Sequence, residues 1–480
     1  SVHETPSKML VASMVPGLAG MHQQQQRATG TTTAADIDAF LKPSITFTID
    51  DSPDSSSPSP EGWQRHARDA ATLRELNCSD DILGSTVKMV DAAAEGDPLA
   101  MAGLGAMYLL GQECSPKRNL TWAVHWLQRA SALGQPDAMA TMGFLHDSDA
   151  LRYVYNFTAV RFERAKALPL YEAAAARGSL YASMALGYKH HHGFGVARES
   201  CPASSAHYEQ AAVKAVEEID VLRKLQVEQG IIPEVSHLAQ LARSMPPRDS
   251  MDAAAVEYLD YCAHVGDSAG KVSMAHIIHA GTHGARRDPR LAKHWLRSAA
   301  RQGDPMGHAN LGMLQLRHGE YRSAVKSLRR AAKANEPSGW AGLSYSYLYG
   351  AGLPQSDELA AKAMSMAARH GHLDAIFNLG VMTMKGRGVK QSARNAYRLW
   401  AVAAEYSHPQ AQLLVGRMAL RGLAVYKDCP TAQFFLKHAV ELGPLPRWLL
   451  SQALAAYSAD RPQRALMFYM LGAHAGIDVA

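Results

Sequence analysis

The chain has 480 residues, of which 47% are hydrophobic and 19% charged, and its 49 basic and 44 acidic residues give a formal charge of +5. The basic residues form no continuous block, which argues against a dedicated nucleic-acid-binding protein and against a polybasic segment that binds a membrane surface. No apolar run reaches the roughly 18 to 20 residues that cross a bilayer. The five cysteines are scattered without C-x-x-C, which excludes a dense disulfide scaffold and a zinc pattern and leaves one or two disulfides open.

The N-terminal 62 residues are predicted to be disordered. Stretches such as HQQQQ and DSPDSSSPSPEG offer too little apolar surface to offset the entropy of ordering the chain. Ser1 is not an initiator methionine, so we expect a processed or trimmed N-terminus. From about Trp63 the pattern becomes helical, and residues 63–97 are predicted to form capping helices.

From about residue 93 the sequence becomes repetitive. The segments AAEGDPLAMAGLGAMYLLG (93–111) and AARQGDPMGHANLGMLQL (299–316) both join a small-residue pair, a Gly-Asp-Pro turn and an apolar helix with an internal Leu-Gly. Such repeats predict pairs of short helices, here called helix A and helix B, that stack into one continuous core. The predicted fold is therefore all-α, an α-solenoid of about nine helix-turn-helix repeats.

Glycine recurs in register inside helix A. Because glycine in a helix interior costs about 1 kcal/mol relative to alanine, we expect these positions to mark close helix–helix approach. Helix B carries a large residue four before a small pair, as in Trp126 before Ala130 and Trp295 before Ala299, and this side chain is expected to fill the space between helices. The glycines are Gly105, Gly143, Gly187, Gly312, Gly380 and Gly416, and Ser344 takes the place between Gly312 and Gly380.

The repeats fall into two predicted blocks. Three repeats span residues 98–215 and six span 255–480. Residues 216–254, which contain GIIPE and SMPPRDS, are predicted to form an interrupting linker or hinge. The second block ends in the middle of a repeat, so we expect further chain beyond Ala480.

The stretch YKHHHGFGV (188–196) places three histidines before a Gly-x-Gly turn. The turn recurs without histidines at Gly386 and Gly388, so Gly193 and Gly195 are interpreted as repeat positions that end helix A in a left-handed cap. Neighbouring helix positions point about 100° apart, so three consecutive histidines do not converge on one tetrahedral ion, and no partner cysteine or carboxylate is evident. We predict a structural role and no metal site, with metal binding or pH sensing as the alternatives.

Signatures of catalysis and of cofactor binding are missing. The sequence contains no H-E-x-x-H and no G-x-S-x-G. The stretch from Gly266 to Val272 resembles a phosphate loop, but its two glycines have the wrong spacing and no Ser or Thr follows Lys271. We therefore predict no catalytic residue, no cofactor and no enzyme activity, and we favour a binding scaffold.

Three of the seven asparagines lie in sequons of the form N-x-[ST], namely Asn77, Asn119 and Asn156. These are candidate N-glycosylation sites. They favour passage through the secretory pathway, with coincidence in a cytosolic protein as the alternative.

The repeat pattern A-x-x-x-L-G-x-x-Y-x-x-G-x-G-V, followed by A-x-x-W/Y-x-x-x-A-A, resembles the Sel-1-like repeat family, a relative of the tetratricopeptide repeat. Within that family, residues 165–201, with Leu186-Gly187-Tyr188 and Ser200-Cys201, resemble the luminal adaptors of Hrd-type ubiquitin ligases. Residues 257–281, 339–353 and 453–480 fit the same adaptors in the same order.

This resemblance implies a non-catalytic adaptor of endoplasmic-reticulum-associated protein degradation. Such adaptors lie in the endoplasmic reticulum lumen, associated with the membrane through partners or a C-terminal segment. The implied partners are misfolded glycoprotein clients, a mannose-binding lectin and a membrane-embedded ubiquitin ligase, with no nucleic acid, and the family also implies a homodimer. The alternative is a generic Sel-1-like signalling or assembly scaffold in another compartment.

Overall fold

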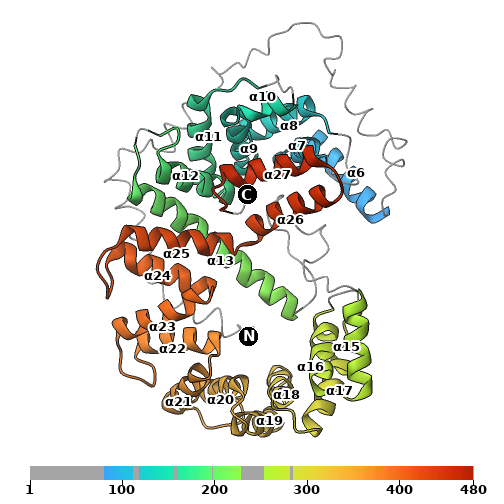
Figure 1. Ribbon diagram of the computed structural model, residues 1–480, viewed down its shortest axis with the longest axis vertical. Coiled ribbons are helices and arrows are strands. Elements are labelled where there is room, and N and C mark those ends of the chain that lie inside the picture. The colour runs from blue at the N-terminus through green and yellow to red at the C-terminus, as the bar shows by residue number, and fades with distance from the viewer. Residues whose placement is uncertain are drawn as a thin grey trace. The chain divides into compact units, whose positions relative to one another are not determined.

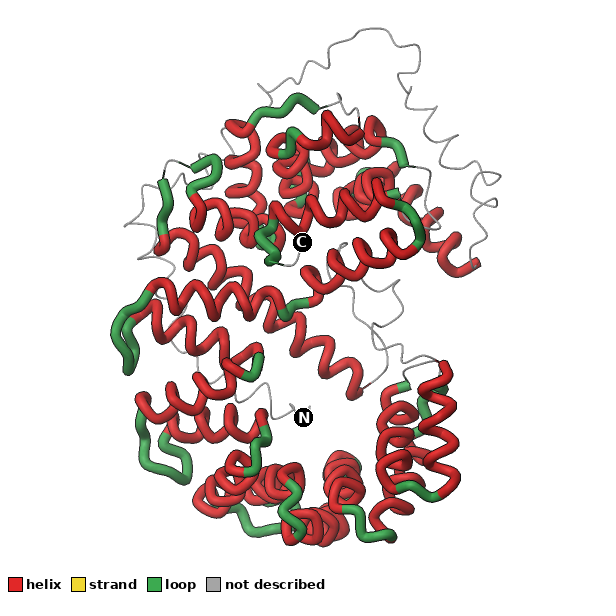
Figure 2. Tube along the Cα trace, viewed as in Figure 1, coloured by secondary structure: helices red, strands yellow, loops and turns green. Residues whose placement is uncertain are grey.

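The computed structural model describes residues 80–111, 118–155, 160–196, 198–228, 253–281 and 285–478. In these ranges every regular element is an α-helix (Figures 1 and 2). The predicted disordered segment 1–62, and residues 63–79 of the predicted capping segment, lie outside the described residues. The chain divides into two compact units, unit 1 (Ser1–Ala182) and unit 2 (Ser183–Ala480).

Unit 1 is built from short helices that pack as neighbours. Helix α6 packs on α7, α7 pairs with α8, and α9 pairs with α11 after the short insertion α10 (Figure 1). The helices are α6 (Asp80–Glu95), α7 (Pro98–Leu110), α8 (Leu120–Ala132), α9 (Pro136–Asp147), α10 (Ala150–Tyr155), α11 (Arg164–Ala176) and the first turn of α12 (Leu180–His192).

Unit 2 contains the rest of α12 and the remaining helices, and from α15 to α25 each helix packs on the next one in the chain. The helices are α13 (Cys201–Glu228), α15 (Ala253–Val265), α16 (Ser268–Ala280), α17 (Pro289–Arg301), α18 (Pro305–Arg317), α19 (Tyr321–Lys333), α20 (Pro337–Tyr349), α21 (Asp357–Arg369), α22 (Leu373–Lys385), α23 (Ala393–Glu405), α24 (Pro409–Arg421), α25 (Cys429–Glu441), α26 (Pro444–Ser458) and α27 (Pro462–His474).

The predicted α-solenoid of about nine repeats is confirmed. The described residues contain nine A–B pairs: α7–α8, α9–α11, α12–α13, α16–α17, α18–α19, α20–α21, α22–α23, α24–α25 and α26–α27. Helices α6 and α15 stand before α7 and α16 and pack on them.

The turns between pairs are set by local side chains. In the turn from α17 to α18, Gly303 adopts φ +85°, and Asp304 then caps α18 by accepting hydrogen bonds from the N–H groups of Met306 and Gly307. Pro305 occupies the first helical position, where its missing N–H costs nothing. The left-handed Gly386, at φ +70°, ends α22.

A small residue at the eighth position of helix A faces a large side chain of helix B. A Cβ added at Gly380 would lie 2.4 Å from Trp400 Nε1, so no side chain larger than hydrogen fits there. Trp400 donates a hydrogen bond of 3.1 Å to Phe377 O, which fixes the indole against helix A. The same arrangement joins Gly105 to Leu127, Gly143 to Tyr171, Gly187 to Tyr208, Gly312 to Leu328 and Gly416 to Leu436.

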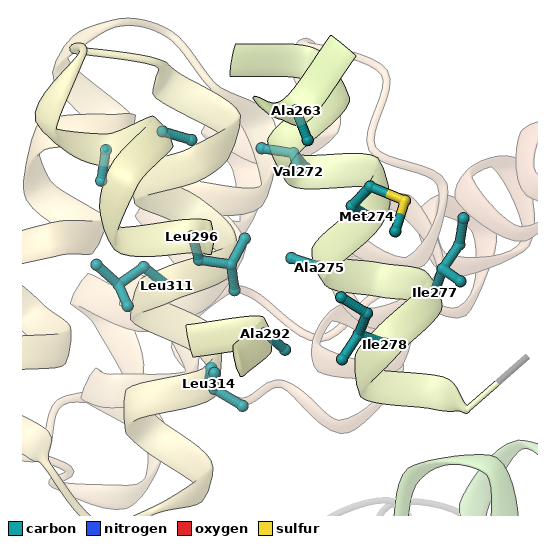
Figure 3. Close-up of a cluster of buried hydrophobic side chains, with 12 residues drawn as sticks. Ala263, Val272, Met274, Ala275, Ile277, Ile278, Ala292, Leu296, Leu311 and Leu314 are labelled. Atoms are coloured by element: carbon teal, nitrogen blue, oxygen red, sulfur yellow. The ribbon is translucent and has the colours of Figure 1, made fainter. Parts of the chain in front are cut away.

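In two pairs, the helix B residue that faces the small residue of helix A lies one position after the predicted Trp126 or Trp295. Leu127 faces Gly105, although Trp126 is also buried. Leu296 is buried in a cluster with Ala275, and Trp295 packs only against the edge of that cluster (Figure 3). The reason is helical geometry: the residue that shares a face with a small pair lies three and four positions before it, as Leu127 does relative to Ala130 and Ser131.

The A helices of neighbouring pairs lie closer together than the B helices do. Helix α7 contacts α9, α16 contacts α18 and α18 contacts α20, whereas no two neighbouring B helices of the described chain pack as extensively. At these steps the row of pairs therefore curves with its A helices on the inner side, as the small residues along helix A allow.

We predict that Gly416→Ala lowers the free energy of unfolding by about 1–2 kcal/mol. The added Cβ would lie 2.7 Å from Leu436 Cγ, and this overpacking outweighs the better helix propensity of alanine. Leu436→Ala should cost about 2–5 kcal/mol alone. Together the two changes should cost less than their sum, because the smaller side chain makes room for the new methyl group. Urea unfolding of the four proteins measures this coupling, and a stabilising Gly416→Ala would contradict it.

Candidate functional site: the closure between helices α13 and α25

Unit 2 contains a contact between helix pairs that are far apart in the sequence. Helix α13 packs against α25 and α24, although α13 belongs to the third pair and α24–α25 is the eighth (Figure 1). In a simple solenoid each repeat contacts only its neighbours. We call this contact, with the bonds that hold it, the closure.

A disulfide between Cys201 and Cys429 joins the two helices of the closure at their first residues. The bond spans 228 residues of sequence, and the Cα atoms are 6.2 Å apart, within the range of natural disulfides. The free cysteine among the described residues is Cys262. The sequence left the pairing open. Its one available signal is that Cys-Pro begins helix B in both pairs.

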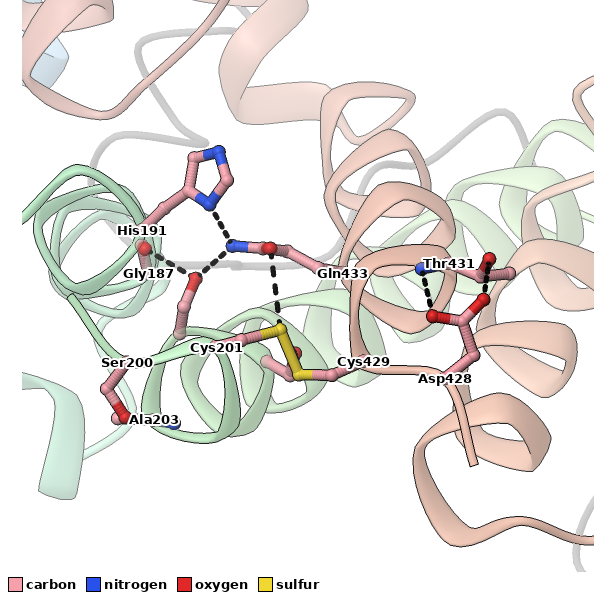
Figure 4. The surroundings of a disulfide bond; sticks show 11 residues. Gly187, His191, Ser200, Cys201, Ala203, Asp428, Cys429, Thr431 and Gln433 are labelled. Carbon is pink, nitrogen blue, oxygen red and sulfur yellow. Dashed lines mark hydrogen bonds between the residues drawn. A yellow bond between two sulfur atoms is a disulfide. The ribbon is translucent and has the colours of Figure 1, made fainter. Parts of the chain in front are cut away.

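A glutamine connects the three helices beside the disulfide (Figure 4). Gln433 Nε2 donates to Ser204 Oγ at 2.6 Å and lies 2.7 Å from His191 Nδ1. Ser204 Oγ in turn donates to Gly187 O at 2.7 Å. Gln433 and Ser204 are both buried, so the hydrogen bonds that link α12, α13 and α25 through Gly187 O are shielded from water, whereas His191 is exposed.

Charged and polar side chains continue the closure along α13. Glu209 accepts hydrogen bonds from Arg417 Nε at 2.7 Å and from an Arg421 guanidinium nitrogen at 2.8 Å. Three turns after Glu209 on α13, Asp220 accepts from Gln410 Nε2 through both carboxylate oxygens. These contacts fix the register of α13 against α24. No local sequence pattern predicts these contacts, because the partners lie about 200 residues apart.

The closure also explains where the units divide. The boundary between the compact units falls within α12, because α13 packs with the later repeats. Residues 216–228 continue α13, and residues 229–252 lie outside the described residues.

The three histidines at the end of α12 have different surroundings. The His190 ring stacks on His207 at 5.4 Å, His191 meets Gln433, and His192 lies between the rings of Tyr188 and Phe194. No group of three metal-ligating side chains with metal-site geometry occurs in the part of the chain that the structure describes. Gly193 and Gly195 follow with φ of +70° and +72°.

Burial lowers the pKa values of the stacked pair His190 and His207. Loss of water around the imidazole, with a smaller contribution from neighbouring His190, lowers the pKa of His207 to about 4. Burial also lowers the pKa of His190. Both rings are therefore neutral at physiological pH, which permits their stacking.

Of the three candidate glycosylation sites, Asn119 is described, while Asn77 and Asn156 lie outside the described residues. Asn119 is exposed and caps α8: its Oδ1 accepts a hydrogen bond of 3.1 Å from Trp122 N. This leaves Nδ2, the atom that carries an N-linked glycan, outside that bond. Thr121, the third residue of the sequon, is also exposed. In the described ranges, none of the helices has the length and apolarity to span a membrane.

Comparison with known proteins identifies the repeat. The family model of the Sel1 repeat matches residues 98–135, 271–304, 341–372, 373–405 and 409–444. The ERAD-associated E3 ubiquitin-protein ligase component HRD3B of Arabidopsis thaliana is 23% identical over 304 residues, which cover 61% of this chain and 43% of that protein. The chitin synthase regulator SKT5 of Saccharomyces cerevisiae is 32% identical over 88 residues, covering 17% of this chain and 13% of that protein. The chain thus spans less than half the length of either curated relative.

Two solved structures also match. A Sel1 repeat protein from Oxalobacter formigenes is 20% identical, with 78% of this chain and 91% of that chain covered and a TM-score of 0.35. A protective antigen of uropathogenic Escherichia coli strains that displays an SLR fold is 22% identical, with 81% and 93% covered and a TM-score of 0.27.

We predict that replacing both Cys201 and Cys429 by serine lowers the free energy of unfolding by about 2–5 kcal/mol. Removing the bond frees a long loop in the unfolded chain and leaves the closure to its non-covalent contacts. Cys262→Ser is the matched control and should be nearly neutral, because Cys262 is free. Denaturant unfolding compares the three proteins. A reducing agent should abolish the difference between wild type and the double variant, and a difference that survives reduction would contradict this explanation.

The stability of unit 2 should fall between about pH 6.5 and pH 4 through His207. In the unfolded chain histidine titrates near pH 6.5, whereas the pKa of buried His207 is about 4, so acid protonates the unfolded state first. The free energy of unfolding that depends on neutral His207 is fully present above pH 6.5, and about 2–3 kcal/mol of it is lost near pH 4.5. His207→Phe keeps an aromatic ring against His190 and should reduce the loss by that amount. Equal pH profiles for variant and wild type would show that His207 is not responsible.

Proposed function

Because the chain carries Sel1 repeats, we propose that it is a non-catalytic adaptor of endoplasmic-reticulum-associated protein degradation. In this role it binds misfolded glycoprotein clients and a mannose-binding lectin and connects them to a membrane-embedded ubiquitin ligase. The similarity to HRD3B, over 61% of this chain, supports this assignment over other uses of the repeat.

The observation that carries the proposal is the Cys201–Cys429 disulfide. Structural disulfides persist in oxidising compartments, such as the endoplasmic reticulum lumen, and are rare in the cytosol. Here the bond joins helices that already fit each other through Gln433, Glu209 and Asp220, so it belongs to the packing of the closure. The exposed sequon at Asn119 favours the same compartment.

The repeats supply the mechanical part of this function. The inner, A-helix side of each row and its outer, B-helix side are separate surfaces on a rigid array, so one adaptor has room for more than one partner. The closure prevents the third and eighth pairs from moving apart, which keeps the surfaces of unit 2 in a fixed arrangement.

A second candidate is a Sel1-repeat assembly scaffold in another compartment. The similarity to the chitin synthase regulator favours this reading, although it extends over only 88 residues. The two candidates differ in compartment and in partners, so glycosylation and partner recovery distinguish them.

We predict that Asn119 carries an N-linked glycan. Thr121→Ala should abolish the glycan and keep the Asn119 cap of α8, and Thr121→Ser should retain both. The measurement is the mass of the protein before and after glycosidase treatment, in a host with a functional secretory pathway. Thr121→Ala should lose one glycan increment relative to wild type and Thr121→Ser. An unmodified Asn119 in all three proteins would remove this support for the lumen.

The partners are tested by affinity purification of the full chain from membranes of its native organism under mild detergent. The proposal expects a membrane ubiquitin ligase and a lectin among the recovered proteins. Recovery of cytosolic partners alone would defeat it and favour the second candidate.

A further inference from the structure

Basic residues concentrate on two neighbouring repeats of unit 2. Residues 285–335 contain twelve Lys and Arg and three Asp and Glu, although the whole chain has a formal charge of only +5. The two B helices of this segment, α17 and α19, contain no acidic residue at all. The near-neutral balance of the whole chain concealed this local excess.

The helical period gathers seven of these cations, together with His294, into two parallel rows. Positions 2, 6, 9 and 13 of each helix share one face, because they are spaced i, i+4, i+7 and i+11. All of the side chains in the rows are exposed. The rows are Arg290, His294, Arg297 and Arg301 on α17, and Arg322, Lys326, Arg329 and Lys333 on α19. We call the eight residues the basic stripe.

The two rows lie next to each other on the outer side of the array. Lys293 of α17 forms an ion pair with Glu320, the residue that precedes α19, so the helices are neighbours in space as well as in the repeat. Each row is about 16 Å long at 1.5 Å per residue. Figure 1 shows α17 and α19 following each other in the row of unit 2 helices.

The cations of the basic stripe form no ion pair with a carboxylate among the described residues. The acidic residues near the stripe are engaged elsewhere. Glu320 pairs with Lys293, and Asp288 and Asp304 accept hydrogen bonds from the first N–H groups of α17 and α18. An uncompensated positive surface therefore remains exposed to solvent.

We propose that the basic stripe is a docking surface for an acidic, extended segment of a partner protein. Successive cations in a row are about 5–6 Å apart, from their spacing of three or four helical residues. In an extended chain, residues i and i+2 are about 6.6 Å apart and point the same way. An extended segment with a carboxylate at every second residue therefore places about one carboxylate beside each side chain of a row.

A polypeptide fits this surface better than a membrane or a nucleic acid. Five of the eight side chains are arginine, whose guanidinium pairs with carboxylates through two parallel hydrogen bonds. The apolar faces of both helices are buried in the array, Leu296 and Leu328 among them. Of their large apolar side chains only the isolated Leu291 and Tyr321 are exposed, which is less apolar surface than an interfacial helix inserts into a bilayer. Neither row contains a Trp, Tyr or Phe on which bases could stack.

The test uses the full chain and a fluorescent peptide of five Glu-Ser repeats, with a Lys-Ser peptide as the charge control. The stripe variant combines Arg322→Gln, Lys326→Gln, Arg329→Gln and Lys333→Gln, which preserve helix propensity at exposed positions. The matched control removes the same charge at exposed sites outside the stripe, by Arg198→Gln, Lys390→Gln, Lys427→Gln and Arg447→Gln. Circular dichroism and thermal unfolding establish that all proteins are folded.

Wild type and the control variant should bind the Glu-Ser peptide with similar affinity, weakened by salt. The stripe variant should bind at least about tenfold more weakly, the combined effect of four exposed ion pairs. Absence of saturable binding, or equal binding by both variants, would overturn the inference. So would tighter binding of phosphatidylserine vesicles or duplex DNA through the same four residues.

This inference rests on the scaffold function proposed above, and the two can fail separately. The stripe variant is also used in the affinity purification from membranes. If wild type recovers the ubiquitin ligase but binds no acidic peptide, only the stripe inference fails. If wild type binds the acidic peptide through the stripe and recovers no ligase, the degradation role fails while the docking surface stands.

Discussion

The structure depends on the fit between a small residue of helix A and a large side chain of helix B. Helices of 13 residues are marginal alone in water, so each pair must bury its apolar face against its partner and its neighbours. Gly380 and Trp400 show how close the approach is, since even a methyl group at residue 380 would collide with the indole. Repeating this fit in six of the nine pairs builds a continuous core from elements that are individually unstable.

A stack of such pairs has two ends and gains stability only from nearest neighbours. The closure changes this in unit 2, because α13 bonds to pairs that follow it by about 200 residues. Gln433 supplies buried hydrogen bonds, Glu209 supplies ion pairs with Arg417 and Arg421, and the disulfide makes the contact permanent under oxidising conditions. A scaffold that must present surfaces in a fixed arrangement benefits from such a bond, and the compartment and the shape of unit 2 thereby become linked.

The sequence was sufficient to predict what is local and periodic. The repeat, the helix pairs and the cap at Gly386 follow from patterns within about 40 residues, and the structure contains them. Which large side chain meets the glycine depends on the helical face: Trp126 is buried as well, but Leu127 is the residue that faces Gly105. The closure could not be predicted, since a Cys-Pro at the start of helix B is too short a signal to specify a partner 228 residues away. The basic stripe is not evident from the net charge of +5, because acidic residues elsewhere in the chain balance the excess of Lys and Arg on α17 and α19.

The central claim is that the third and eighth helix pairs are covalently joined while the protein performs its function in an oxidising compartment. The most direct measurement is peptide mapping by mass spectrometry of the protein purified from its native membranes, with free thiols blocked during lysis. The account predicts a linked pair of peptides that contain Cys201 and Cys429, with Cys262 alkylated. Recovery of both Cys201 and Cys429 as alkylated thiols, or their linkage to other cysteines, would contradict it.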